Sequence, residues 1–386
     1  MGSIVVAGGY GAFGSRIVER LSRDQDLDIV VAGRNADKAA AAVASLNPQA
    51  KARLSSTRLD ASLATPAELA ALSARVVINA SGPFQTQDYT LARAAIAAGC
   101  HYVDLADARD FVMGIGALDA EASRAGVAVI SGASSVPGLS SAVVEHYRER
   151  FSQIHEISIG ISPGNSFDPG EATAASVLSG VGRPIRTWEN AEPRTVYGWQ
   201  GLSRHEFPGL GTRLMGYVDV PDLALFPDRI PGLRTIRFRA GLEVGFFHLG
   251  LYGLSWLSRA EILRHPERLA RPMLAMKRRL GFLGSDSGGM FVEITGTGLD
   301  ATPLKLSWTL VANKGDGPYV PGLGAVALAK STNLDQIGWV GARPCFNCFS
   351  LAQFRKAAQG LQIQDSTTMH FQRKESAALH GDGMAE

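Results

Sequence analysis

The chain has 386 residues, and its 38 Lys and Arg against 36 Asp and Glu leave a net charge of +2. That length exceeds what one hydrophobic core usually organises, so two domains are expected. The balanced charge argues against a nucleic-acid or general membrane-binding surface, and three cysteines are too few for a disulfide framework. With no charged and apolar leader before the first predicted strand, we expect a cytoplasmic protein without a transmembrane segment.

The N-terminal residues predict a strand that turns into a helix through closely spaced glycines. Residues 4–7 (Ile-Val-Val-Ala) are typical of a buried strand, and Gly9-x-Gly11-x-x-Gly14 follows at once. In this pattern the glycines allow a tight turn, a close approach to a pyrophosphate, and packing of the helix on the strand. The alternative is an ordinary turn in a glycine-rich chain. We predict a dinucleotide-binding loop made of Gly8, Gly9, Tyr10, Gly11, Ala12 and Phe13.

The second predicted strand, residues 28–32, ends in a sequence that favours NADP over NAD. An NAD site usually has an acidic residue here for the ribose 2′-hydroxyl, whereas this chain has Arg34. A guanidinium offers forked donors to a 2′-phosphate, and Lys38 adds a second charge. The alternative is that Arg34 is a solvated surface residue. The predicted cofactor contacts at this strand end are Gly33, Arg34, Asn35 and Lys38.

Four more strands and their helices complete a predicted parallel sheet. The third strand ends at Asp60, which either contacts the adenine or caps the next helix. The other strands are predicted at residues 75–80, 101–107 and 127–131, with helices from Thr65 and over 89–98. Ligands bind outside the carboxyl ends of such strands, so we expect the nicotinamide ribose near Ala80, Ser81 and Gly82.

Four stretches of the first 145 residues resemble the saccharopine dehydrogenase-like NADP-binding oxidoreductases. They are Gly-Gly-Tyr-Gly-Ala-Phe-Gly (8–14), Val-Val-Ile-Asn-Ala-Ser-Gly-Pro-Phe (76–84), Ala-Gly-Cys-His-Tyr-Val-Asp-Leu-Ala-Asp (98–107) and Val-Pro-Gly-Leu (136–139). A weaker similarity continues through residues 170–176 and 315–330. The resemblance implies a Rossmann domain joined to an α+β domain, and reduction or oxidation with NADP(H). No set of amino-acid carboxylate clamps maps onto this chain, so the resemblance leaves the substrate open.

The second half independently predicts a mixed, largely antiparallel sheet. Strands are expected at residues 156–162, 194–199, 235–243, 290–298 and 302–313, and helices at 320–331 and 350–359. The predicted organisation is therefore α/β, with a doubly wound parallel sheet followed by an α+β domain. Its parts are a Rossmann domain at 1–145, a substrate or dimerisation domain at 146–335, a segment at 336–375 that packs back on the first domain, and a flexible tail at 376–386.

Residues 241–258 stand apart because they are rich in large apolar side chains, and a basic run follows at 276–280. Glu243, His248 and four glycines argue against a transmembrane helix. One interpretation is a buried helix or a subunit interface. The others are a wide apolar substrate pocket or a face that contacts a membrane peripherally. The pocket interpretation would imply an apolar substrate.

Hydride transfer to a carbonyl or imine needs a proton donor, and the end of the fifth strand offers the best candidates. Strand alternation places Tyr102 and Asp104 on one face, so we predict Asp104 as the first catalytic candidate and Tyr102 as the second. The alternative is that Asp104 caps a helix or holds a neighbouring loop. His101 is interpreted as structural, as are Cys345 and Cys348, which have no second pair to complete a metal site.

Two functions from different classes follow. In the first, the protein is an NADP(H)-dependent oxidoreductase that acts on a carbonyl, imine or enoyl small molecule held between the domains, most simply as a homodimer. In the second, it binds NADPH as a sensor or scaffold without turnover. No metal-ligand cluster and no Gly-x-Ser-x-Gly motif supports a metalloenzyme or a hydrolase. An enzyme should have an open pocket with a titratable group at the nicotinamide end, which a sensor could fill with side chains.

Overall fold

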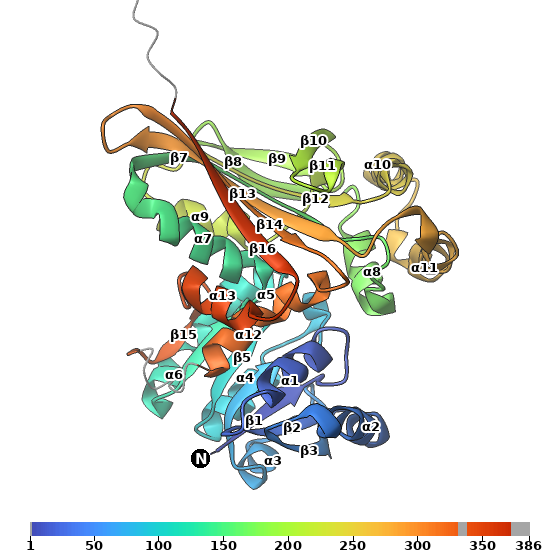
Figure 1. Ribbon diagram of the computed structural model, residues 1–386, viewed down its shortest axis with the longest axis vertical. Helices are drawn as coiled ribbons and strands as arrows, with labels where there is room; N and C mark the ends of the chain where they lie inside the picture. The colour runs from blue at the N-terminus through green and yellow to red at the C-terminus, as the bar shows by residue number, and fades with distance from the viewer. Residues whose placement is uncertain (1, 331–337, 372–386) are drawn as a thin grey trace, which may run out of the picture.

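The computed structural model describes residues 2–330 and 338–371 and contains two sheets stacked along the long axis of the molecule (Figure 1). The first has seven parallel strands in the order β15-β6-β5-β4-β1-β2-β3. Its strands are β1 (Ser3–Ala7), β2 (Asp28–Gly33), β3 (Arg53–Arg58), β4 (Ala74–Asn79), β5 (His101–Asp104), β6 (Ala128–Ser131) and β15 (Gly341–Pro344). The predicted doubly wound parallel sheet is confirmed.

Helices cover both faces of this sheet because its central strands are apolar on both sides. In β1, Val6 packs in one core with Ile17 of α1, whereas Val5 packs in a second core with Leu91 of α4. Such two-sided burial gives the continuous apolar runs from which the strands were predicted. The helices of this part are α1 (Gly14–Ser22), α2 (Ala36–Leu46), α3 (Pro66–Ala71), α4 (Thr90–Ala97), α5 (Arg109–Gly114), α6 (Asp119–Ala125) and α7 (Ser140–Tyr147).

The second sheet has nine strands and is mixed and largely antiparallel, as predicted. Its main path is β10-β11-β12-β7-β13-β14-β16, and the β8–β9 hairpin joins it at β12; within the described part of the chain, only β12 and β7 run parallel. The strands are β7 (Phe151–Ser162), β8 (Pro184–Glu189), β9 (Glu192–Tyr197), β10 (Ser203–Phe207), β11 (Gly211–Tyr217), β12 (Thr235–Leu242), β13 (Gly288–Gly298), β14 (Pro303–Ala312) and β16 (Ile363–Phe371).

The C-terminal residues connect the two sheets. β15 pairs with β6 at the edge of the first sheet, and β16 pairs with β14 at the edge of the second. Between them, α12 (Val320–Lys330) is buried along most of its length, and α13 (Leu351–Ala358) lies beside it (Figure 1). A Cβ at Gly322 of α12 would lie 2.7 Å from the Ile17 side chain of α1, so this helix packs closely on the cofactor-binding half. The predicted tail at 376–386 lies outside the described residues.

Two predictions about individual elements are corrected. The strand expected over 101–107 ends at Asp104, because the Asp104 carboxylate accepts the Ala106 N–H at 3.0 Å and the chain turns away from the sheet. The apolar segment forms α10 (Gly245–Arg259), which is neither wholly buried nor wholly exposed: Phe247 and Leu251 face the protein, whereas Phe246 and Trp256 face solvent. Among the described residues, no helix combines the length and apolar character needed to cross a bilayer.

A buried carboxyl ties α7 to α9 (Asp222–Arg229), which packs under the second sheet (Figure 1). The Ser140 hydroxyl donates to Asp222, and burial raises the pKa of Asp222 to about 7. The folded protein therefore holds a proton on Asp222 that the unfolded chain releases near the ordinary aspartate pKa of 3.8. We expect the free energy of unfolding to fall as the pH rises between these two values, by up to a few kcal/mol.

The substitution Asp222→Asn should remove most of that pH dependence, because the amide does not titrate while its oxygen can still accept from Ser140. Urea unfolding of both proteins at a series of pH values would measure it. Asp300→Asn is a control at an exposed turn, where the carboxylate accepts from Thr302. An unchanged slope of stability against pH in Asp222→Asn would assign the dependence to another buried acid.

Candidate functional site

The glycine loop after β1 has the geometry of a dinucleotide cradle. Gly8 has a φ of 76°, which favours glycine, and its N–H donates to the Ala32 oxygen of β2 at 2.8 Å. A Cβ at Gly14 would lie 2.1 Å from the Gly8 oxygen, so no larger residue lets α1 begin this close to the strand. The N-cap residue of α1, Phe13, makes no side-chain capping bond, which leaves the first turn of the helix available to an anion.

Tyr10 and Asn35 shape the cradle beyond β2. The Asn35 N–H donates to the Tyr10 hydroxyl at 3.0 Å, and the Asn35 side chain caps α2 by accepting the Lys38 N–H at 2.9 Å. The Tyr10 ring lies directly over Gly33, where a Cβ would approach it to 2.4 Å. These two predicted cofactor residues therefore fix the shape of the loop, and they leave the Arg34 and Lys38 side chains exposed beside it.

A basic cluster lies at the ends of β2 and β3. The parallel register pairs Gly33 with Arg58, which brings Arg58 next to Arg34, and both side chains are exposed. Asp60 accepts hydrogen bonds from the Ser62 N–H and hydroxyl, which lower the pKa of Asp60 and hold the turn after β3. Arg58 was missed in the sequence, although the strand end was predicted, because only the register shows which residue faces Arg34. The cluster Arg34, Arg58 and Lys38 suits a phosphate monoester.

The loop after β4, which carries Ala80, Ser81 and Gly82, lies against the glycine loop. A Cβ at Gly8 would lie 2.8 Å from the Ala80 oxygen. The buried Asn79 accepts the Ser81 N–H at 3.1 Å, and Gln87 donates to the Ser81 oxygen at 2.8 Å. This loop is thus held rigid at the point where a dinucleotide crossing the glycines would reach the end of β4.

The two predicted catalytic residues, Asp104 and Tyr102, are enclosed at the end of β5. Asp104 accepts the Gly132 N–H at 2.8 Å and the Ser131 hydroxyl at 3.0 Å, which fastens the end of β5 to the loop after β6. Burial raises the pKa of Asp104 to about 6 despite these bonds. The Tyr102 hydroxyl accepts from Asn79 at 3.1 Å, and burial raises the Tyr102 pKa well above its usual value.

These contacts are those of the alternative interpretation, in which Asp104 holds a neighbouring loop. Neither Asp104 nor Tyr102 lines the cavity of about 550 Å³ that lies between the two sheets. Their participation in catalysis stays a prediction. The His101 Nδ1 accepts the Ala128 N–H at 3.0 Å, a structural contact between β5 and β6. Among the residues that the structure describes, no group of His, Cys, Asp and Glu side chains is arranged to hold a metal ion.

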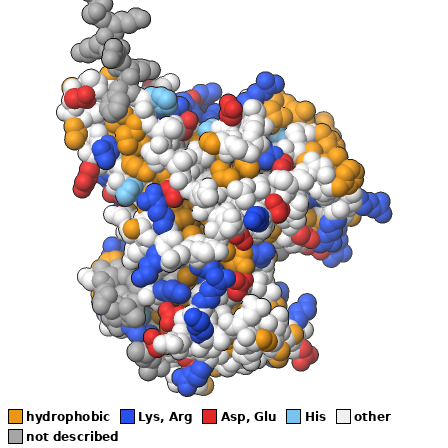
Figure 2. All heavy atoms as spheres, viewed as in Figure 1, with side chains coloured by type: hydrophobic (Ala, Val, Ile, Leu, Met, Phe, Trp, Pro, Cys, Tyr) orange, Lys and Arg blue, Asp and Glu red, His pale blue; other side chains and the backbone are white. Residues whose placement is uncertain are grey.

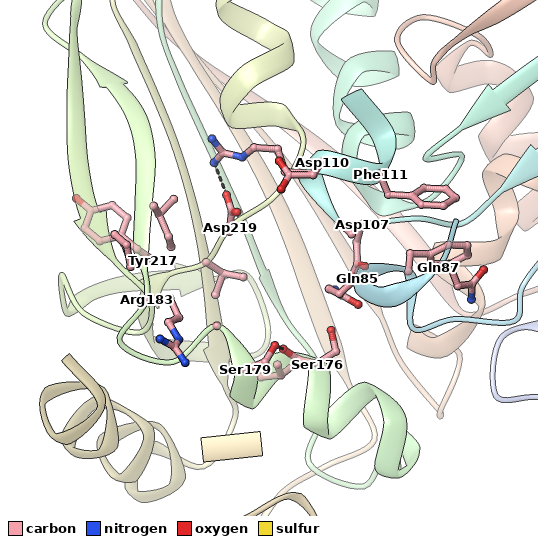
Figure 3. A pocket seen from close by; sticks show the side chains of 18 of the residues that line it. Gln85, Gln87, Asp107, Asp110, Phe111, Ser176, Ser179, Arg183, Tyr217 and Asp219 are labelled. Atoms are coloured by element: carbon pink, nitrogen blue, oxygen red, sulfur yellow. Dashed lines mark hydrogen bonds and ion pairs between the residues drawn. The ribbon is translucent and has the colours of Figure 1, made fainter. Parts of the chain in front are cut away.

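A cavity of about 550 Å³ lies between the loops of the first sheet and the second sheet (Figure 3). From the first sheet it receives Gln85, which follows β4, and Asp107, which follows β5. Facing them are Ser176 and Ser179 of α8 (Gly170–Ser179), and Arg183 lies to one side (Figure 3). The cavity therefore begins beside the loop that carries Ala80, Ser81 and Gly82, at the nicotinamide end of the predicted cofactor path.

Four charged side chains give this cavity its chemistry: Asp107, Arg183 and the pair of Arg109 with Asp219. Asp107 is open to the cavity but is surrounded by its walls, and the resulting desolvation raises the pKa of Asp107. Arg109 forms an ion pair with Asp219 and also donates to the Arg186 oxygen at 2.8 Å (Figure 3). Arg183 is exposed. A carboxyl group with a raised pKa is suited to donate a proton to a developing oxyanion or amine.

The cavity residues of the second half were not found in the sequence. Arg183 and Asp219 lie in loops without a motif, and only the fold brings them to β4 and β5. Asp107 is the cavity residue that the sequence came closest to identifying, since it ends the stretch 98–107 that carries the family resemblance. Strand alternation favoured Asp104 instead. A second, mostly apolar hollow of about 120 Å³ contains Phe13 of the glycine loop and Ser135 after β6.

Comparison with known proteins supports the first half of the site. Residues 4–130 match the family model of the saccharopine dehydrogenase NADP binding domain, which confirms the resemblance seen in the sequence. This match supports an NAD(P)-dependent oxidoreductase. No curated protein matches the chain.

One solved structure extends the likeness in fold to the second half. Apo histidine-tagged saccharopine dehydrogenase (L-Glu forming) from Saccharomyces cerevisiae aligns with a TM-score of 0.67 and 15% identity, over 95% of this chain and 100% of that one. GenD2 from gentamicin A biosynthesis, in complex with NAD, aligns with a TM-score of 0.38 and 15% identity, over 77% of this chain and 70% of that one. The first comparison shows a shared two-sheet fold.

Proposed function

We propose that this protein is an NADP(H)-dependent oxidoreductase that transfers a hydride to or from a carbonyl, imine or enoyl group. One observation carries the proposal: the cradle formed by Gly8 and Gly14 leads to an open cavity of about 550 Å³ that contains a titratable carboxyl, Asp107. A protein that only senses NADPH has no need for such a space. A cytoplasmic location and a homodimer complete the proposal, and sedimentation velocity tests the homodimer.

The residues divide into those that hold the cofactor and those that handle the substrate. Backbone N–H groups of the glycine loop and the start of α1 would bind the pyrophosphate, and Arg34 with Arg58 would bind the 2′-phosphate. When bound, NADP(H) supplies or accepts the hydride. In reduction, Asp107 donates a proton to the substrate oxygen or nitrogen, and in oxidation it accepts that proton. Arg183 and the Arg109–Asp219 pair orient polar groups of the substrate.

The cofactor assignment is tested by thermal-shift titration with NADPH and with NADH. A ligand at about a hundred times its Kd stabilises a protein by about 2.7 kcal/mol, which is visible as a rise in melting temperature. NADPH should stabilise the wild type more than NADH does. Screening carbonyl, imine and enoyl compounds for NADPH consumption then separates the enzyme from the sensor. If neither nucleotide stabilises the wild type, the oxidoreductase proposal fails.

Removing either arginine of the basic cluster should weaken NADPH binding selectively. A hydrogen-bonded contact between charged groups contributes about 1.5–3 kcal/mol, so Arg34→Ala or Arg58→Ala should raise the Kd for NADPH about 10- to 150-fold and leave NADH binding unchanged. Arg53→Ala is the matched control, because Arg53 is an exposed arginine at the start of β3, the strand that ends at Arg58. Equal losses for NADPH and NADH would show that these arginines do not read the 2′-phosphate.

A further inference from the structure

Helix α10 is apolar on two opposite sides. One side packs inward through Phe247, Leu251 and His248, and burial lowers the pKa of His248 to about 4, so that it stays neutral. The other side presents Phe246, Leu249, Trp256 and Leu257 to solvent, at the spacing of one helical face. A helix that needed only to complete the core would have polar residues on that outer side.

The exposed apolar side chains continue from α10 onto the elements that follow it. Ile262 is 74% exposed after α10, and Phe282 is 79% exposed just beyond α11 (Ala270–Arg279). Of the fourteen large hydrophobic side chains that are exposed in the described residues, eight lie between residues 246 and 283. We call these eight the α10–α11 surface: Phe246, Leu249, Trp256, Leu257, Ile262, Met276, Phe282 and Leu283. Figure 2 shows hydrophobic side chains gathered over α10.

Basic side chains surround this surface. Residues 245–284 contain seven Arg and Lys against two Glu, in a chain whose net charge is only +2. Arg271 and Arg278 are paired with Glu171 and Asp168, but Arg264, Arg268 and Arg279 are exposed. In Figure 2 the blue side chains lie beside the apolar ones, over α11. The surface thus combines exposed aromatic rings with a positive border.

The positive charge of this border favours an anionic membrane over a second copy of the chain as the partner of the surface. In a symmetric dimer through this surface, two sets of like charges would face one another at close range, which opposes association. An anionic lipid bilayer complements both features, because apolar side chains enter the boundary of the acyl chains while Arg and Lys contact the headgroups. We propose that the α10–α11 surface docks the protein peripherally on anionic membranes. This proposal stands apart from the proposed oxidoreductase activity.

The docking surface adjoins the wall of the cavity. His248 of α10 packs against Trp199, with ring centroids 5.5 Å apart, and Trp199 lines the cavity. Helix α8, which also lines the cavity, is joined to α11 by the Arg271–Glu171 pair. A protein docked through this surface would hold its cavity near the bilayer, where apolar substrates dissolve.

Vesicle co-sedimentation tests the docking surface without a substrate or a cofactor. The full chain is mixed with vesicles of phosphatidylcholine alone or of phosphatidylcholine with phosphatidylglycerol, at low and high salt. We expect binding to the anionic vesicles only, and weaker binding as salt screens the charges. The double variant Trp256→Ser/Phe282→Ser should bind at least tenfold more weakly, and Leu299→Ser, an exposed leucine in the β13–β14 turn, is the matched control.

A second variant tests the charges independently of the aromatic residues. Arg264→Glu/Arg279→Glu should lose at least twentyfold in affinity for anionic vesicles, since each basic residue contributes about fivefold, and should keep the wild-type melting temperature. The proposal is overturned if the wild type does not bind anionic vesicles, or if both double variants bind them with the same affinity as Leu299→Ser. It is also overturned if sedimentation velocity reveals a dimer that Trp256→Ser/Phe282→Ser dissociates, because a second copy then covers the surface.

Discussion

The substitution Asp107→Asn is expected to lower the turnover number by about a hundredfold to ten-thousandfold, the range for loss of a general acid–base group. Asp107 is the carboxyl that lines the cavity beside the loop after β4, and its environment raises its pKa. An amide keeps the shape and the hydrogen-bonding oxygen but cannot carry the proton. Binding of NADPH, measured by thermal shift, should be unchanged because the glycine loop and the basic cluster are intact.

The pH profile distinguishes a proton donor from a structural role. For reduction, kcat of the wild type should fall as the pH rises through the raised pKa of Asp107, and this limb should be absent in Asp107→Asn. Two matched variants complete the test. Asp110→Asn removes another carboxyl from the same cavity, and Asp104→Asn removes the buried one that the sequence favours. If Asp104→Asn alone abolished turnover and left the melting temperature unchanged, the catalytic role would return to Asp104.

The substitution Gly14→Ala is expected to abolish detectable dinucleotide binding at ordinary concentrations. The added Cβ would lie 2.1 Å from the Gly8 oxygen, and neither atom can swing aside, because the Cβ is bonded directly to Cα and the oxygen belongs to the backbone. Either α1 moves away from β1 or the glycine loop shifts, and each displaces the N–H groups that face the pyrophosphate. Overpacking of this kind costs about 1–3 kcal/mol of stability, so the melting temperature should also fall by several degrees.

Substitutions at two other glycines distinguish a loss of dinucleotide binding from a loss of stability. At Gly116, in the same half of the chain, a Cβ would meet nothing within 4 Å, so Gly116→Ala should change neither property. At Gly11 a Cβ would meet only the Gly8 oxygen, at 3.1 Å, and would otherwise project into open space. Gly11→Ala should therefore keep nearly the wild-type melting temperature and lose the stabilisation by NADPH. If it kept that stabilisation, the pyrophosphate would not pass over Gly11.

The sequence predicted the elements whose signals are local. The run of β-branched residues at 4–7 and the glycines after it fixed the first strand, the first helix and the ligand edge of the sheet. Thr65 as the cap of α3 belongs to the same class, because a cap acts within three residues. The glycine loop and the elements around it could therefore be predicted before the fold was known.

The substrate half depends on contacts that have no local signal. The alternation predicted that Tyr102 and Asp104 share a face, but the sequence could not show that both are buried or that the Asp104 carboxylate accepts the Gly132 N–H. Strands β8 and β10 were missed because charged residues interrupt their apolar pattern, and β11 was missed because its glycines and polar residues leave no apolar alternation. The end of β11 and the loop after it bring Tyr217 and Asp219 to the cavity. Only tertiary structure identifies them.

The position of β15 affects the order in which the protein can fold during synthesis. The ribosome releases β6 long before residues 341–344, so the nascent first sheet has an unpaired edge while strands β7 to β14 of the second sheet are being made. An open edge of apolar parallel strands is a site where other chains can add and aggregate. Translation must therefore reach the C-terminal segment before this edge is protected, and a chain that stops before β15 leaves it open.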